Sequence, residues 1–102
     1  MQPRALTVTQ LLAALNGQVA IVDRLGDLDG SITSVTDDSR SVSSGSLFVA
    51  VKGERVDGHK YVGQAIKAGA AAIVGQDSVE RASVPFVQVT DSRKALGLIG
   101  SR

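Results

Sequence analysis

The sequence contains no cysteine and no tryptophan, and its single histidine is His59. Without cysteine the chain can form neither disulfides nor thiolate metal sites, and it fits a reducing compartment. One imidazole argues against a histidine-rich metal site and against a complete Ser-His-Asp triad. We therefore expect no metal site and no bound metal cofactor in this chain.

Strong charge, aromatic rings and long apolar runs are also scarce. The formal net charge is +1 and aromatic residues make up 3%, whereas a nucleic-acid-binding surface needs a basic excess and stacking rings. No apolar run approaches the ~20 residues of a membrane span, and the first ten residues lack the apolar core of a secretory signal. The 102 residues predict one soluble, cytoplasmic domain with no nucleic-acid partner and no membrane span.

Short continuous apolar runs are what the chain does contain, and Leu47–Val51 is the clearest of them. Continuous rather than alternating apolarity predicts strands buried on both faces, as in a parallel sheet. Helical spacing of apolar residues predicts flanking helices. The expected fold class is α/β, a small three-layer domain with a parallel or mixed sheet flanked by helices. The predicted strands are residues 47–51, 71–74 and 85–89, and the predicted helices lie near 8–16, 60–68 and 91–99.

Weaker signals complete the secondary structure. Thr7 and Gln10 have the spacing of a capping box at the start of the first helix. Thr90 has the position of an N-cap for the last helix. Residues 19–22 and 31–36 are further strand predictions.

A first polar segment, Asp37–Gly45, lies between two predicted strands. In an α/β sheet the loops that leave the carboxyl ends of strands line the ligand crevice. Asp37 and Ser39 can hydrogen-bond a ligand there, and Arg40 offers a planar fork for phosphate or carboxylate. On spacing alone, however, a Ser-rich surface turn that satisfies its own backbone is the favoured interpretation.

A second segment, Gly53–His59, joins the best strand to the middle helix. Its glycines, Gly53 and Gly58, permit close backbone approach, and the helix start that follows favours an anion. Arg55 can hold a phosphate or carboxylate. An ordinary loop in which Asp57 or His59 caps the helix fits equally well.

Basic residues outnumber acidic ones by five to two from Arg40 to Lys67. Such a local excess suits an anion site, although a solvated face is its commoner cause. The sequence has no G-x-x-x-x-G-K-[ST] phosphate loop, no G-x-G-x-x-G fingerprint and no H-E-x-x-H motif. Spacing alone therefore supports a small-molecule-binding α/β domain and no named reaction.

A long ordered pattern goes further than these motifs. Residues 38–74, DSRSVSSGSLFVAVKGERVDGHKYVGQAIKAGAAAIV, and the later run VPFVQVTDSRKAL resemble the N-terminal domain of the Mur ligases. The resemblance covers roughly residues 8–99. Within the family it is most similar to the MurE type, which adds meso-diaminopimelate or L-lysine to UDP-MurNAc-L-Ala-D-Glu. The MurF type, which adds D-Ala-D-Ala, is the close alternative.

The resemblance implies a division of labour between domains. In Mur ligases the N-terminal domain holds the UDP end of the UDP-linked muramyl peptide. A central domain carries the phosphate loop, ATP and magnesium, and a C-terminal domain helps bind the incoming amino acid. The chain would then be a single UDP-binding domain that binds no cofactor itself and is inactive without its parent's other domains.

Carried over residue by residue, the family's uridine contacts fall on two loops. The first holds Asp37 and Ser39, and the second holds Glu54, Arg55 and Val56. Ser39 is the most secure of these, because the family position of Asp37 is often apolar and that of Glu54 varies. The residues predicted to support the site are Arg40, Gly53, Asp57, Gly58 and His59.

Two other classes of function compete with this interpretation. The chain can be a freestanding α/β interaction module without nucleotide affinity, or a complete small enzyme that uses His59 and the Ser39 loop. The missing second catalytic partner argues against the small enzyme.

Overall fold

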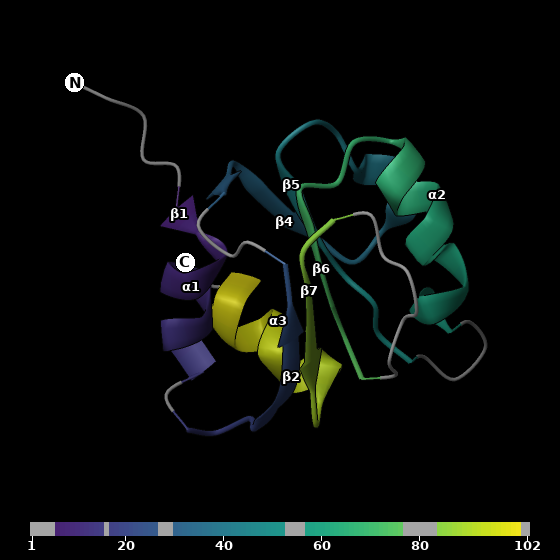
Figure 1. Cartoon of the computed structure of the whole chain (residues 1–102). Helices are drawn as coiled ribbons and strands as arrows, with labels where there is room; N and C mark the ends of the chain where they lie inside the picture. The colour runs from purple at the N-terminus through teal and green to yellow at the C-terminus, as the bar shows by residue number, and fades with distance from the viewer. Residues whose placement is uncertain (1–5, 16, 27–29, 53–56, 77–83, 101–102) are drawn as a thin grey trace.

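The computed structural model describes residues 6–15, 17–26, 30–52, 57–76 and 84–100 (Figure 1). Short 3₁₀ turns, labelled η, are interleaved with the helices and strands. In chain order the elements are β1 (Leu6–Thr7), α1 (Val8–Leu12), η1 (Ala13–Leu15), β2 (Ile21–Leu25), β3 (Ser31–Ile32), β4 (Ser34–Thr36), η2 (Ser39–Ser41), β5 (Ser46–Val49), η3 (Gly58–Tyr61), α2 (Val62–Lys67), β6 (Ala72–Gly75), β7 (Phe86–Val89) and α3 (Ser92–Gly100).

Five strands form one mixed sheet in the order β2-β7-β6-β5-β4. The pairs β4–β5, β5–β6 and β6–β7 are parallel, while β2 runs antiparallel to β7 at the edge. A separate two-stranded antiparallel sheet pairs β1 with β3. The predicted mixed sheet on three apolar runs is therefore confirmed.

Alternate residues of the central strands face opposite helices. Leu47 and Val49 of β5 pack into the cluster that contains α1 and α3, whereas Phe48 and Ala50 pack into the cluster that contains α2. Figure 1 shows α1 and α3 on one side of the sheet and α2 on the other, which makes the three predicted layers. All four side chains are fully buried, which explains why the run is apolar throughout.

The first helix starts as its sequence predicts. The Thr7 hydroxyl accepts from the Gln10 amide at 3.1 Å, and the Gln10 side chain accepts from the Thr7 amide at 2.9 Å. The capping box is thereby complete. The α-helix ends at Leu12, and the chain continues as the 3₁₀ turn η1. The predicted helix over 8–16 therefore consists of an α-helical part and a 3₁₀ part.

The last helix is capped by a different residue from the one predicted. Asp91 Oδ1 accepts from the Lys94 amide at 3.0 Å, so Asp91 is the N-cap. The Thr90 hydroxyl accepts instead from the Ala20 amide at 3.2 Å. The prediction for Thr90 is wrong because Ala20, the residue before β2, lies beside Thr90 and donates to its hydroxyl oxygen.

The predicted strand over 31–36 is divided between two sheets. Its first part, β3, pairs with β1, and its second part, β4, pairs with β5. Between them the Thr33 amide donates to the Gly45 carbonyl at 2.9 Å, outside either ladder. The predicted strand at 19–22 lies at Ile21–Leu25. None of the helices in the described ranges is long and apolar enough to cross a membrane.

Candidate functional site

A groove of about 600 Å³ lies at the carboxyl ends of the parallel strands. One wall is the loop Asp37–Arg40, which follows β4, and the other is built from Val51 after β5 and from Gly58, Tyr61 and Gln64 of η3 and α2. In open α/β sheets, ligands bind at this edge, outside the carboxyl ends of the strands. Four of the residues predicted for the site, Asp37, Ser39, Arg40 and Gly58, thus line one groove.

Four residues predicted for the second wall cannot be placed. Gly53, Glu54, Arg55 and Val56 lie outside the described residues, and their predicted roles stay predictions. The flanking residues Lys52 and Asp57 form an antiparallel bridge. The ends of the segment are therefore held together beside the groove.

The first wall is shaped by Asp38. Its Oδ1 accepts from the Arg40 amide at 2.9 Å and from Arg40 Nε at 3.1 Å. Its Oδ2 accepts from Arg40 Nη2 at 3.1 Å. Hydrogen bonds from the Arg40 side chain and backbone lower the pKa of Asp38, and the same carboxylate raises the pKa of Arg40. Since a guanidinium has five N–H donors, Arg40 is oriented by Asp38 and still has N–H donors for a ligand.

The second wall begins with a compact turn. Asp57 Oδ1 accepts from the His59 amide at 3.0 Å and contacts His59 Nδ1 at 2.6 Å. Gly58 N donates to the Val51 carbonyl at 2.9 Å. A Cβ on Gly58 would lie 2.8 Å from the Val51 nitrogen, so this approach requires glycine. Of the two predicted caps, Asp57 is the one that forms.

Both ring nitrogens of His59 make hydrogen bonds within the protein. The Gln76 amide donates to His59 Nε2 at 2.9 Å. Because a backbone N–H can only donate, Nε2 is unprotonated and Nδ1 carries the hydrogen bonded to Asp57. Both ring nitrogens are occupied and the side chain is 9% exposed. This arrangement gives no support to a small enzyme that uses His59 as its base.

Arg93 is a groove residue that the site prediction omitted. It follows β7 on the first turn of α3, and its Nη2 donates to the Lys52 carbonyl at 3.4 Å. Tyr61 and Gln64 were also omitted. The available signal was positional, because Arg93 comes four residues after a buried strand and so at the carboxyl edge of the sheet.

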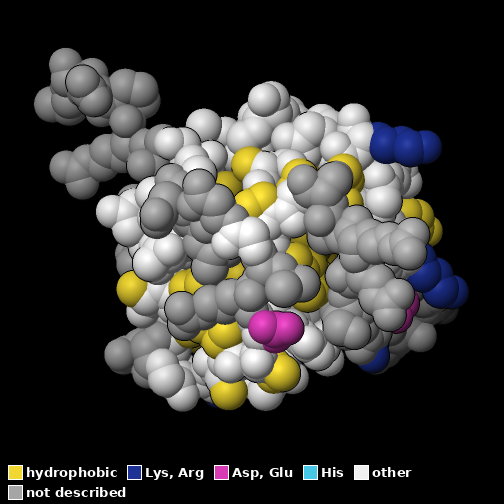
Figure 2. Space-filling model, in the orientation of Figure 1, with side chains coloured by type: hydrophobic (Ala, Val, Ile, Leu, Met, Phe, Trp, Pro, Cys, Tyr) yellow, Lys and Arg dark blue, Asp and Glu magenta, His cyan; other side chains and the backbone are white. Residues whose placement is uncertain are grey.

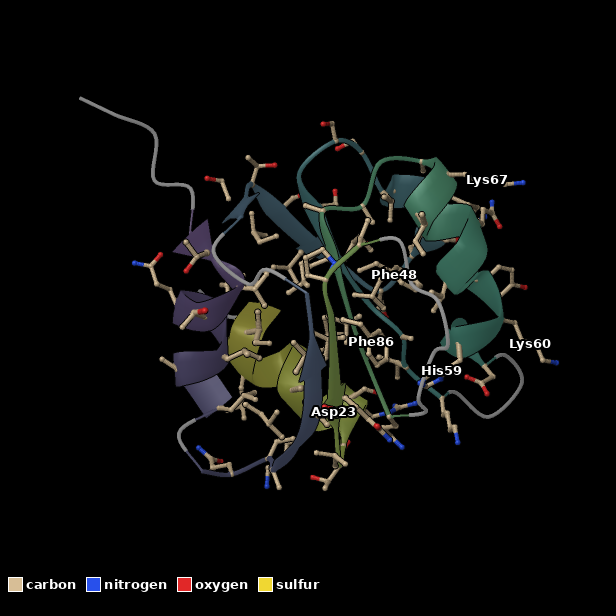
Figure 3. All side chains as sticks on the ribbon, in the orientation of Figure 1. Asp23, Phe48, His59, Lys60, Lys67 and Phe86 are labelled. Carbon is tan, nitrogen blue, oxygen red and sulfur yellow. The ribbon has the colours of Figure 1, made fainter. Side chains whose placement is uncertain are left out.

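Two of the five residues in the local basic excess lie away from the groove. Lys60 and Lys67 are exposed and are not among the groove residues. Figure 2 shows lysine and arginine side chains at the edge of the molecule formed by α2, where Figure 3 labels Lys60 and Lys67. For these two residues the solvated-face explanation holds. Within the described ranges no three His, Asp or Glu residues are grouped as a metal site.

Acid is expected to weaken the fold through Asp57. Hydrogen bonds from the His59 backbone and side chain lower the pKa of Asp57 in the folded state. A depressed folded pKa stabilises the fold above the unfolded value of about 3.9, and that contribution is lost as the pH falls through the folded pKa. We expect the free energy of unfolding, measured by urea denaturation, to fall more steeply below about pH 4 in the unmodified chain than in Asp57→Asn. Asp37→Asn is the control, and parallel curves for the chain and Asp57→Asn would contradict the prediction.

Comparison with known proteins decides the family. A family profile described as "Mur ligase family, catalytic domain" matches residues 31–102. The UDP-N-acetylmuramoyl-L-alanyl-D-glutamate–2,6-diaminopimelate ligase of Bacillus licheniformis is 42% identical over 92 residues, which is 90% of this chain and 18% of that protein. The chain belongs to the Mur ligase family. The ligase of the same name from Parabacteroides distasonis is 51% identical over 73 residues, which is 70% of this chain and 15% of that protein.

A solved Mur ligase has the same fold as this Mur ligase chain. A crystal structure of MurF from Acinetobacter baumannii matches it with a TM-score of 0.75 and 32% identity, over 96% of this chain and 21% of that one. The Mur ligase chain thus spans less than a quarter of the length of these relatives. The relatives that match over that part of their length are named as ligases.

Proposed function

We propose that the chain is the N-terminal, substrate-binding domain of a MurE-type ligase, and that its groove holds the UDP end of UDP-MurNAc-L-Ala-D-Glu. The observation that carries this proposal is the position of the groove. It lies where β4 and β5 end, between the Asp37–Arg40 loop and the turn at Gly58. The relatives that are 42% and 51% identical are named for that substrate and for 2,6-diaminopimelate, which favours diaminopimelate over lysine as the amino acid added.

The groove offers each kind of contact that a uridine diphosphate needs. The Ser39 hydroxyl and the Asp37 carboxylate can hydrogen-bond the base or ribose. Arg40 and Arg93 supply positive charge for the diphosphate. The Tyr61 ring is 40% exposed beside them and can stack on a base.

Titration with UMP or UDP, followed by amide chemical shifts, tests this assignment. We expect shifts at Asp37–Arg40 and at residues 54–58, with a weak affinity of about −4 to −6 kcal/mol. Ser39→Ala removes one hydrogen bond of about 0.5–1.5 kcal/mol, which weakens binding about two- to tenfold. Ser44→Ala, an exposed serine of the same segment that does not line the groove, is the matched control. Shifts clustered at residues 77–82, or an unchanged response in Ser39→Ala, would overturn the assignment.

The chemistry of the reaction belongs to other domains of the parent enzyme in this proposal. ATP and magnesium would be held by a central domain, where the substrate carboxylate is phosphorylated and then attacked by the amine of the diamino acid. The 102 residues contain no phosphate-loop motif. We expect the purified chain to hydrolyse no ATP above a heat-treated control in a phosphate-release assay, and measurable turnover would contradict the proposed division. The site of action would be the cytoplasm.

The MurF type is the second candidate, and one observation favours it. The match to a MurF structure extends over 96% of the chain with a TM-score of 0.75. An assay of the parent ligase with 2,6-diaminopimelate and with D-Ala-D-Ala as alternative acceptors separates the two types. A freestanding interaction module, the remaining alternative, predicts no response to either nucleotide in the titration above.

A further inference from the structure

A chain of hydrogen bonds crosses the carboxyl edge of the sheet beneath the groove. It runs from Asp57 through the His59 ring to the Gln76 amide, as described above. The Gln76 side-chain oxygen then accepts from the Ser92 amide at 2.9 Å and from the Ser92 hydroxyl at 3.1 Å. Gln88 Nε2 donates to the Gln76 carbonyl at 2.9 Å. This series of hydrogen bonds therefore connects η3, β6, β7 and the start of α3.

The two ends of this series of hydrogen bonds adjoin two residues of the groove lining. Asp57 and His59 flank Gly58, and Ser92 precedes Arg93; Gly58 and Arg93 both line the groove. Figure 3 shows His59 directed toward the sheet while Lys60 points outward. A shift of the imidazole would thus change the positions of two residues of the same site.

The imidazole has little freedom to shift. A Cβ built on Gly75 would lie 3.0 Å from His59 Nε2, so the ring packs directly on the β6 backbone. Ser92, at the other end of the chain, is fully buried. The His59 side chain is 9% exposed with both ring nitrogens bonded, and such a group holds a single geometry because a broken bond would leave it unsatisfied in a low dielectric.

We propose that His59 is a positioning residue that, through its two ring nitrogens, fixes two residues of the nucleotide groove, Gly58 and Arg93. This inference rests on the proposed function, since it assigns the groove to a uridine diphosphate. The ring itself is not part of the groove lining. Its Nδ1–H donates to Asp57, and its Nε2 accepts from Gln76.

The first test needs no ligand. Long-range ¹⁵N–¹H spectra of the 102-residue chain at neutral pH are expected to show the Nδ1–H tautomer of His59, with Nε2 unprotonated. The Nε2–H tautomer, or rapid exchange between the two, would overturn the proposal whether or not the chain binds nucleotide. His59→Leu is expected to move the Gly58 amide and Arg93 Nε–H signals, and unmoved signals would equally overturn it.

The second test separates positioning from general stability. In a UDP titration, His59→Leu is expected to weaken binding at least fivefold, and His59→Gln, whose side-chain oxygen can take the Gln76 N–H, to recover part of that loss. Leu12→Ala, which removes a buried side chain on the far side of the sheet, is the matched destabilised control. Equal weakening in Leu12→Ala and His59→Leu at the same loss of melting temperature would overturn the proposal. A chain that binds no UDP but keeps the tautomer and the coupled shifts overturns the proposed function alone.

Discussion

Phe48→Ala is expected to lower the free energy of unfolding by about 3–5 kcal/mol. The ring is fully buried between the sheet and α2, in a cluster with Ile73, Phe86 and Val62 (Figure 3). Truncation removes the transfer free energy of the ring and leaves a cavity that the strands on either side cannot fill. Since small domains are stable by about 5–15 kcal/mol, this loss brings the chain close to unfolding.

Urea denaturation with circular dichroism measures the effect. Val22→Thr on β2 is the control, because Val22 is 59% exposed and the replacement keeps a β-branched side chain, so a change within about 0.5 kcal/mol is expected. A loss below about 1 kcal/mol in Phe48→Ala would show that the α2 face of the sheet repacks freely.

Gly58→Ala is the second substitution with a large expected effect. The new Cβ would meet the Val51 nitrogen at 2.8 Å, the Val51 oxygen at 3.0 Å and the Ala50 Cα at 3.3 Å. All three are backbone atoms of the segment that follows β5, so no side chain can rotate away. We expect the turn to move off the sheet, with a loss of about 1–3 kcal/mol from overpacking and with weaker binding of UDP in the groove.

Gly63→Ala is the matched control for this substitution. It lies in α2, and no atom comes within 4 Å of a Cβ built there. Alanine replaces glycine in a helix at a gain of about 0.5–1 kcal/mol. Opposite signs for the two substitutions in thermal unfolding are the expected result. A neutral Gly58→Ala would show that the approach of the turn to Val51 is not tight.

The sequence predicts the layers of this fold better than its junctions. A run that is apolar at every position, such as Leu47–Val51, can be satisfied only by burial on both faces, so the parallel sheet follows from local pattern. The division of residues 31–36 between two sheets does not follow from local pattern. It depends on Thr33 donating to Gly45, twelve residues along the chain, and no local propensity encodes that pairing.

The groove likewise combines features that the local sequence predicts with features that depend on long-range contacts. Asp37, Ser39 and Arg40 follow a strand and could be predicted from position and side-chain chemistry. Arg93 joins them because α3 begins where β7 ends and reaches the Lys52 carbonyl, 41 residues away in sequence. Such convergence is a property of the topology. The role of Ser39 in binding stays a prediction, as do those of Glu54, Arg55 and Val56.

The position of β2 has a consequence for the order in which the chain folds. Strands β4, β5 and β6 each pair with the next strand in sequence, but β2 pairs with β7, so that Ile21 lies opposite Val89. Ala20 and Thr90, which bond to each other, are separated by 70 residues. Long-range pairing carries the loop-closure entropy of everything between and slows folding. During synthesis on the ribosome, β2 therefore emerges early but cannot pair with β7 until almost the whole domain has been made. Until β7 has been made, the nascent sheet of β4, β5 and β6 ends at β6, and that edge is open to pairing with another chain.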